Sequence, residues 1–193
     1  MAAGQDLQAT PAPDATPTPD ATTAVSTATR HVMQANKSKN TKPELRVRAA
    51  LRDAGLVGYR IHWKKAPGKP DICFPGRRVA IFVNGCFWHR CPHCALPLPK
   101  SNVDFWQAKF ARNVARDERD LRLLSADGWT VLVVWECALK GDAFDSTMSS
   151  LVREVRRAED LGPSFGGRVV EVGSAAPWKL RVSRTRARGR ARR

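Results

Sequence analysis

Twelve residues near the middle of the chain, VNGCFWHRCPHC starting at Val83, hold three cysteines, two histidines and two large aromatic side chains. Structural zinc sites take four Cys or His ligands in a tetrahedron, often with a close C-x-x-C pair. The segment has such a pair, one cysteine five residues before it, and a further cysteine after a later apolar run. The pattern predicts a structural Zn²⁺ site whose ligands are Cys86, Cys91, Cys94 and Cys137, with His93 as the alternative to Cys91. Unrelated free thiols are the competing interpretation.

Oxygen and imidazole groups that could act on a phosphate lie on both sides of this segment. Asp71 starts the apolar run DICF, and a tight turn leads into VAIFVN, which ends at Val83 and Asn84. Such a hairpin could hold Mg²⁺, which needs only one carboxylate and one backbone carbonyl from the protein. An Asp after Pro is also a common turn former.

His89 follows two aromatic residues and precedes the C-x-x-C pair. An imidazole held there could activate water or protonate a leaving oxygen. Its other interpretations are a spare zinc ligand or a surface histidine. Glu44, in the first turn of a predicted helix, is a further carboxylate candidate, although its position alone is typical of a solvated acid at a helix start.

Three aromatic residues, Phe87, Trp88 and Trp106, stand in or beside loops and close to basic side chains. Proteins that open duplex DNA insert apolar side chains between base steps. For Trp106, packing in the core of a helix is an equal alternative, whereas Trp129 and Trp135 are expected in the core. The basic neighbours are Arg90, Lys100, Lys109, Arg112 and Arg116.

Composition and charge restrict the class of protein. The 193 residues are 42% hydrophobic and carry a formal net charge of +15, which remains positive without the seven arginines of the last thirteen residues. Such a charge favours a nucleic-acid partner, because Lys and Arg release counterions when they neutralise phosphates. No long apolar run or signal pattern indicates a membrane or export. We expect a cytoplasmic, nucleoid-associated protein whose cysteines are reduced, with Cys73 a buried hydrophobe.

Residues 1–30, rich in Ala, Thr, Pro and Asp, predict a disordered leader, and residues 161–193 a flexible basic tail. The folded unit is predicted over 31–160. Its first helix starts after Thr41 as N-cap, with Pro43 in the first turn, and stops at Gly55. Hydrophobic periodicity predicts a three-stranded meander over residues 59–63, 71–74 and 79–84. It then predicts a helix over 105–126, a buried strand over 129–135 and a last helix over 144–161. The class is α/β.

Five segments, in order and spacing, resemble the very-short-patch repair (Vsr) DNA mismatch endonucleases. They are TKPELRVRAAL, PGKPDICF, VAIFVNGCFWHRCPHC, FWQAKFARNVARDERD and GWTVLVVWEC, and the resemblance spans Met33 to Leu139. It implies a restriction-endonuclease-like (PD-(D/E)XK-type) three-layer α/β/α core with a mixed sheet and a zinc-stabilised loop. It also implies nicking of duplex DNA 5′ to the thymine of a T:G mismatch left by 5-methylcytosine deamination, which begins repair.

The resemblance implies roles for particular residues. Asp71 and the backbone carbonyl of Val83 would bind Mg²⁺, His89 would be the acid-base residue, and Glu44 would assist through water. Three aromatics would enter the duplex beside the mismatch, and Met33 would grip the opposite groove. The full set expected to contact DNA is Met33, Phe87, Trp88, Trp106, Lys109, Arg112, Asn113 and Arg116.

The chain departs from the family at two points. Cys91 stands where a His is common, and Val83 and Asn84 occupy positions that vary among Thr, Asp and His. The Lys of the wider nuclease fold is missing, as it is in this family, which fits a mechanism centred on histidine. The implied partners are duplex DNA with a T:G mismatch and mismatch-repair proteins, and a monomer suffices to nick one strand. The alternatives are a zinc-containing DNA-binding module without catalysis and a nuclease that does not require T:G.

Overall fold

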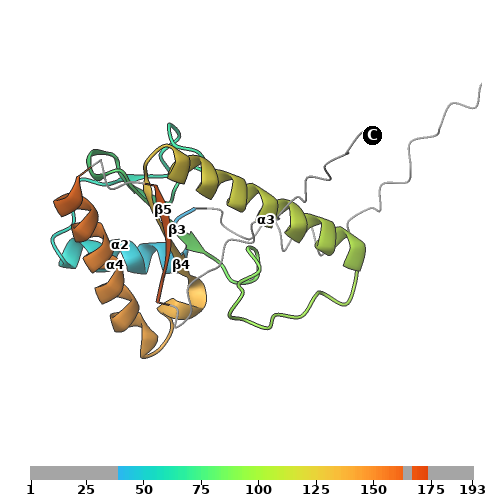
Figure 1. Ribbon diagram of the computed structural model, residues 1–193. Coiled ribbons are helices and arrows are strands. Elements are labelled where there is room, and N and C mark those ends of the chain that lie inside the picture. The colour runs from blue at the N-terminus through green and yellow to red at the C-terminus, as the bar shows by residue number, and fades with distance from the viewer. Residues whose placement is uncertain (1–38, 163–166, 174–193) are drawn as a thin grey trace, which may run out of the picture.

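The computed structural model describes residues 39–162 and 167–173. A five-stranded sheet in the order β1-β2-β3-β4-β5 lies at its centre (Figure 1). The predicted leader and Met33 lie outside the described residues, as does the arginine-rich end after residue 173.

Helix α2 (Lys42–Asp53) starts as predicted. Thr41 is the N-cap, its side chain accepts from the backbone N–H of Glu44, and the Glu44 carboxylate accepts in return from the Thr41 backbone, which completes a capping box. Proline stands in the first turn, where its missing N–H costs no hydrogen bond. The capping box fixes where Glu44 lies on the helix.

The predicted meander is confirmed. Strands β1 (Arg60–Ile61), β2 (Ile72–Phe74) and β3 (Val79–Asn84) are joined by antiparallel pairing of β1 with β2 and of β2 with β3. The first strand is shorter than predicted because His62 has a φ of +45°, which an extended strand cannot continue. The turn between β2 and β3 is the 3-10 helix η1 (Pro75–Arg77).

The second half of the sheet is parallel. Helix α3 (Val103–Ala126) leads into β4 (Thr130–Trp135), which pairs with β3, and the 3-10 helix η2 (Glu136–Leu139) carries Cys137. After α4 (Ala143–Leu161), β5 (Arg168–Val172) pairs with β4. The sequence interpretation placed no strand after residue 161 and was wrong there.

Helices cover both faces of the sheet (Figure 1). On one face, Val47 and Leu51 of α2 and Leu151 and Val155 of α4 pack on apolar side chains of β2, β3 and β4. On the other, α3 packs through residues such as Leu124 on a second buried cluster, which includes Cys73, Trp129 and Trp135. The mixed α/β sheet and the buried roles of these three residues are thus confirmed. No helix within residues 39–162 and 167–173 is long and apolar enough to cross a membrane.

Candidate active site and cysteine cluster

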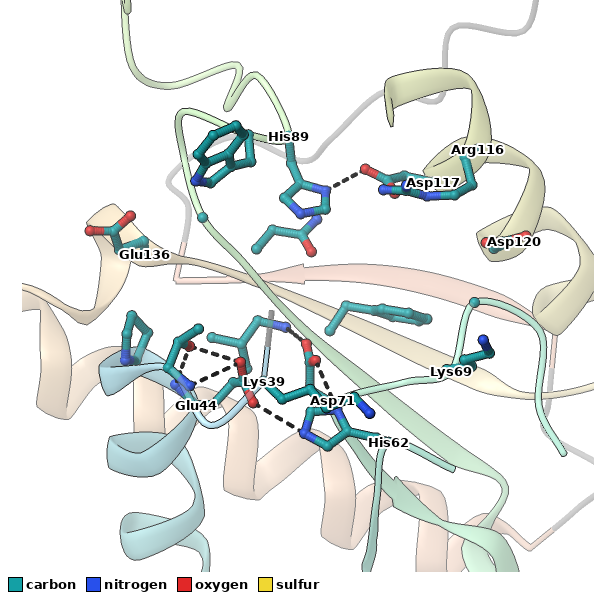
Figure 2. Close-up of a pocket in the computed structure, with 18 of the residues that line it drawn as sticks. Lys39, Glu44, His62, Lys69, Asp71, His89, Arg116, Asp117, Asp120 and Glu136 are labelled. Carbon is teal, nitrogen blue, oxygen red and sulfur yellow. Dashed lines mark hydrogen bonds and ion pairs between the residues drawn. The ribbon is translucent and has the colours of Figure 1, made fainter. Parts of the chain in front are cut away.

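A cavity of about 860 Å³ opens where the start of α2, the turn after β1, the start of β2, the end of β3 and α3 meet. Figure 2 shows the side chains around it: Glu44, His62 and Asp71 lie together on one side, while His89 and Asp117 face each other on another. Basic side chains from several elements also line it, and all are exposed except the half-buried Lys109: Lys39, Lys42, Lys64, Lys69, Lys109 and Arg116. The cavity therefore combines acids inside with a basic edge, which suits a phosphate bound through a cation.

Asp71 lies immediately before β2 and is held against β3. Its Oδ2 accepts from the backbone N–H of Val83 at 2.8 Å. Its Oδ1 lies 3.7 Å from Nδ1 of His62. Burial raises the pKa of Asp71 to about 6, and the nearby Glu44 carboxylate adds to that rise, while the Val83 hydrogen bond opposes it. A buried carboxylate beside a second one is a group that a divalent cation would stabilise in its charged form.

Glu44 is buried, with 4% of its surface exposed, and was not expected to be so from its place in a first turn. Its carboxylate accepts from the backbone N–H of Asn40 at 3.0 Å and from the Thr41 hydroxyl at 2.8 Å. Its Oε2 also lies 3.6 Å from Nε2 of His62. Capping thus aims one carboxylate oxygen toward Asp71 and His62.

His62 joins these two acids, and the sequence interpretation missed it. One ligand atom from each of Glu44, His62 and Asp71 lies within 4.8 Å of the others. Burial lowers the pKa of His62 below its ordinary value, so the neutral imidazole is favoured. These three residues, called the carboxylate–imidazole group below, have the donor chemistry of a divalent metal site.

His89 is oriented by Asp117 of α3. Its Nδ1 lies 2.5 Å from Asp117 Oδ2, and its backbone N–H donates to the Gly85 carbonyl at 3.1 Å. A carboxylate on Nδ1 holds the proton there and leaves Nε2 as the basic nitrogen. Arg116 contacts the same carboxylate at 3.1 Å. Asp117 was also missed, because it is one acid among many charges on a long helix.

The four predicted zinc ligands come together. The Sγ atoms of Cys86, Cys91, Cys94 and Cys137 all lie within 4.8 Å of one another. Sγ of Cys91 and Sγ of Cys137 are 3.7 Å apart, close to the roughly 3.8 Å expected across a tetrahedral zinc with Zn–S bonds of about 2.3 Å. Burial raises the pKa of the Cys91 thiol to about 12, and that of Cys86 is raised as well. A bound cation would stabilise the four cysteines as thiolates, so the donor set fits zinc.

His93 points elsewhere. Its Nε2 contacts the Glu171 carboxylate of β5, whose side chain is almost fully buried. The cysteine cluster, meaning the four cysteines above, closes without it. This geometry favours Cys91 over His93 as the fourth ligand.

The predicted wedge aromatics form one cluster. The Phe87 ring packs edge-on against Trp88, Trp106 and Phe110, with centroids 5.1 to 5.7 Å apart. Trp106 is buried, with 6% exposed, which fits the core-packing interpretation in this state. Phe87 and Trp88 are partly exposed, and Trp88 lines the cavity.

Four further residues expected to contact DNA lie on α3 with the spacing of one helix face: Lys109, Arg112, Asn113 and Arg116. The ammonium of Lys109 stands 5.6 Å from the Trp88 ring, and Asn113 donates to the Trp88 carbonyl at 3.0 Å. Arg112 is exposed. Asn113 therefore positions the aromatic loop, whereas Arg112 presents its charge to solvent.

Comparison with known proteins gives related sequences. Residues 23–96 match the family model described as DNA mismatch endonuclease Vsr. The type II nicking enzyme V.XorIIP of Xanthomonas oryzae pv. oryzae is 49% identical over 110 residues, 57% of this chain and 80% of that protein. The DNA mismatch endonuclease Vsr of Escherichia coli is 42% identical over 56% of this chain and 69% of its own. The type II nicking enzyme V.NmeAIP of Neisseria meningitidis is 41% identical over 66% of this chain and 91% of that protein.

Proposed function

Because the chain belongs to the Vsr family of DNA mismatch endonucleases, we propose that it nicks duplex DNA 5′ to the thymine of a T:G mismatch. The family makes it a DNA-nicking hydrolase with DNA as substrate. The proposal adds the mismatch, the strand position, a Mg²⁺ requirement and a structural zinc. A T:G pair of this kind arises when 5-methylcytosine loses its amino group, so the nick begins its repair.

The observation that carries the proposal is one cavity in which the carboxylate–imidazole group faces the His89–Asp117 pair. Phosphodiester hydrolysis needs stabilisation of charge on the phosphate and a group that moves a proton. The two sets of residues supply these two needs separately. Basic side chains at the rim would hold the flanking phosphates.

Each residue has a defined part in this mechanism. Asp71, Glu44 and the backbone carbonyl of Val83 would hold a divalent ion, which supplies Lewis-acid stabilisation of the phosphate when bound. His89, with Nδ1 held by Asp117, uses Nε2 to take a proton from water or to give one to the leaving oxygen. The cysteine cluster with zinc would hold the loop that carries both His89 and the aromatic pair.

The test is nicking of an end-labelled duplex with one T:G pair, compared with the same duplex carrying C:G or another mismatch. Wild type is expected to cut 5′ to the thymine in Mg²⁺ and to give no cleavage in EDTA. Asp71→Ala is expected to give no cleavage in either condition. Asp53→Ala removes an exposed carboxylate at the end of α2 and should cut as wild type does.

The two rival functions predict other results. Tight binding with no cleavage in several flanking sequences would mean a DNA-binding module without catalysis. Equal cleavage of T:G and perfect duplexes would mean a nuclease without mismatch specificity. Binding of mismatch-repair proteins is a further proposal, tested by whether such a protein changes the nicking rate.

A further inference from the structure

The imidazole of His62 lies between the two carboxylates of the candidate metal site. We propose that His62 is a direct nitrogen ligand of the divalent ion, beside Asp71 and Glu44, and that it makes the site prefer transition-metal ions such as Mn²⁺ to Mg²⁺. The inference rests on the proposed function, because it concerns the same ion. It assigns to His62 a role that the sequence did not suggest.

The distances fit shared ligation better than hydrogen bonding. Nδ1 of His62 is 3.7 Å from Asp71 Oδ1, and Nε2 is 3.6 Å from Glu44 Oε2. Both separations exceed those of a hydrogen bond. Ligand atoms around one octahedral ion, with bonds of about 2.1 Å, lie roughly 3.0 Å apart when adjacent and roughly 4.2 Å apart when opposite. One ion takes only one ring nitrogen, and the 3.6 Å between Nε2 and Glu44 Oε2 falls in that range. One ligand atom from each of Glu44, His62 and Asp71 lies within 4.8 Å of the other two.

His62 also has an unpartnered nitrogen. Its Nε2 is buried and makes no hydrogen bond. A buried polar atom without a partner costs free energy, and the cost is removed if a cation binds there.

The backbone supports the same conclusion. His62 has a φ of +45°, which is uncommon outside glycine, and its N–H donates to the Asp71 carbonyl at 3.3 Å. The left-handed conformation ends β1 and turns the side chain into the cavity instead of along the strand face (Figure 2). Strained backbone of this kind is retained where the surroundings enforce it, often at binding sites.

A nitrogen ligand changes which ions bind best. Mg²⁺ prefers an all-oxygen shell, whereas imidazole suits the first-row transition ions, whose affinity for N and O sites rises from Mn²⁺ toward Cu²⁺. The site is therefore expected to bind Mn²⁺ more tightly than Mg²⁺, and to lose that preference when the imidazole is removed.

The test uses Mn²⁺ as a paramagnetic probe in the full-length protein, alone and bound to nicked duplex. Electron spin-echo spectroscopy is expected to show coupling of Mn²⁺ to a histidine nitrogen, and the coupling should change when the protein is grown with ¹⁵N-histidine. His62→Asn removes the ring but tolerates a positive φ, so it should abolish the coupling and weaken Mn²⁺ binding by about tenfold or more. His93→Asn and His89→Asn should both keep the coupling.

The outcomes separate the inference from the function. If Mn²⁺ binds wild type without histidine coupling, and Asp71→Ala loses the ion, the inference about His62 is overturned. The proposed function is unaffected by that result. Coupling that persists in His62→Asn and disappears in His89→Asn would also overturn it, in favour of His89. A protein that nicks no T:G duplex in either ion would overturn the function, while the spectra would still decide whether His62 is a ligand.

Discussion

The backbone N–H of Val83 donates to Oδ2 of Asp71 at 2.8 Å, so the end of β3 holds the carboxylate that precedes β2. The two strands are paired antiparallel, and β3 is itself paired with β4. One oxygen of Asp71 is thus occupied by the sheet, and the other faces His62. The Asp71 carboxylate of the candidate metal site is therefore anchored to a strand that is paired on both sides.

Replacing Asp71 by Asn is expected to stabilise the metal-free protein at high pH while abolishing nicking. The pKa of Asp71 is 3.8 ordinarily and about 6 in the fold, so the folded state binds more protons between these values. The free energy of unfolding then falls as pH rises through that window, and the loss is constant above it. The full pKa shift corresponds to a loss of at most about 3 kcal/mol in the free energy of unfolding. Asn removes this cost, and its oxygen can still accept from Val83.

The measurement is urea unfolding in EDTA. The free energy of unfolding of Asp71→Asn should be larger than that of wild type at pH 8, and the difference should shrink toward pH 4. Asp53→Asn, at an exposed position, should show no such pH dependence. An Asp71→Asn variant less stable than wild type at pH 8 would mean that the carboxylate contributes more than it costs.

Replacing Asp117 by Asn is expected to lower kcat with little change in KM. The amide cannot hold the His89 ring as a charged carboxylate does, so the Nε2 nitrogen loses its fixed tautomer. Acid-base catalysis contributes about 10²- to 10⁴-fold, and the loss should approach that of His89→Ala. Single-turnover nicking across pH measures it. Glu118→Gln, at the neighbouring position on α3, is the control, and an equal effect there would point to general charge loss.

Substitution in the cysteine cluster is expected to remove zinc. Purified protein should hold about one zinc per chain by atomic emission, and Cys137→Ser should lose it, because Cys137 meets the loop cysteines from η2. Cys73→Ser alters a buried cysteine outside the cluster and should keep the metal. His93→Ala should keep it too. Loss of zinc in His93→Ala with retention in Cys91→Ser would reverse the ligand assignment.

Truncating Trp88 is expected to reduce discrimination between T:G and C:G duplexes. Its ring lines the cavity and is partly exposed, so it can leave the aromatic cluster at modest cost. The ratio of the Kd values for the two duplexes, measured by fluorescence anisotropy, should be closer to one for Trp88→Ala than for wild type. Phe110→Ala is the contrast: this buried ring should cost about 3–5 kcal/mol of stability. Unchanged discrimination in Trp88→Ala would assign that ring to packing alone.

Local signals accounted for much of the fold. Thr41 and Pro43 mark the start of α2, and the apolar runs of β3 and β4 mark a buried sheet. Strand β5 was missed because it has only five residues, and its pairing with β4 and the burial of Val172 both depend on residues distant in sequence. A short strand of this kind depends on a partner that is distant in sequence.

The site was predictable where chemistry was concentrated in sequence. The cysteines of one loop indicated their own cluster, and Asp71 and His89 stood beside strand ends. His62 was hidden because a positive φ turns it out of an alternating strand pattern. Asp117 was hidden because only the crossing of α3 over the sheet brings it to His89. The positions of His62 and Asp117 in the site depend on how helices and strands pack in three dimensions, and residue spacing along the sequence does not describe that packing.

Strand β5 has a consequence for the sheet as a whole. It covers the open side of β4, and its Glu171 reaches His93 in the cysteine-rich loop. A chain cut after α4 would leave β4 as an edge, with a row of unpaired N–H and C=O groups along an apolar strand. Such an edge invites pairing with another copy, so a shortened protein should self-associate even with every candidate catalytic residue in place.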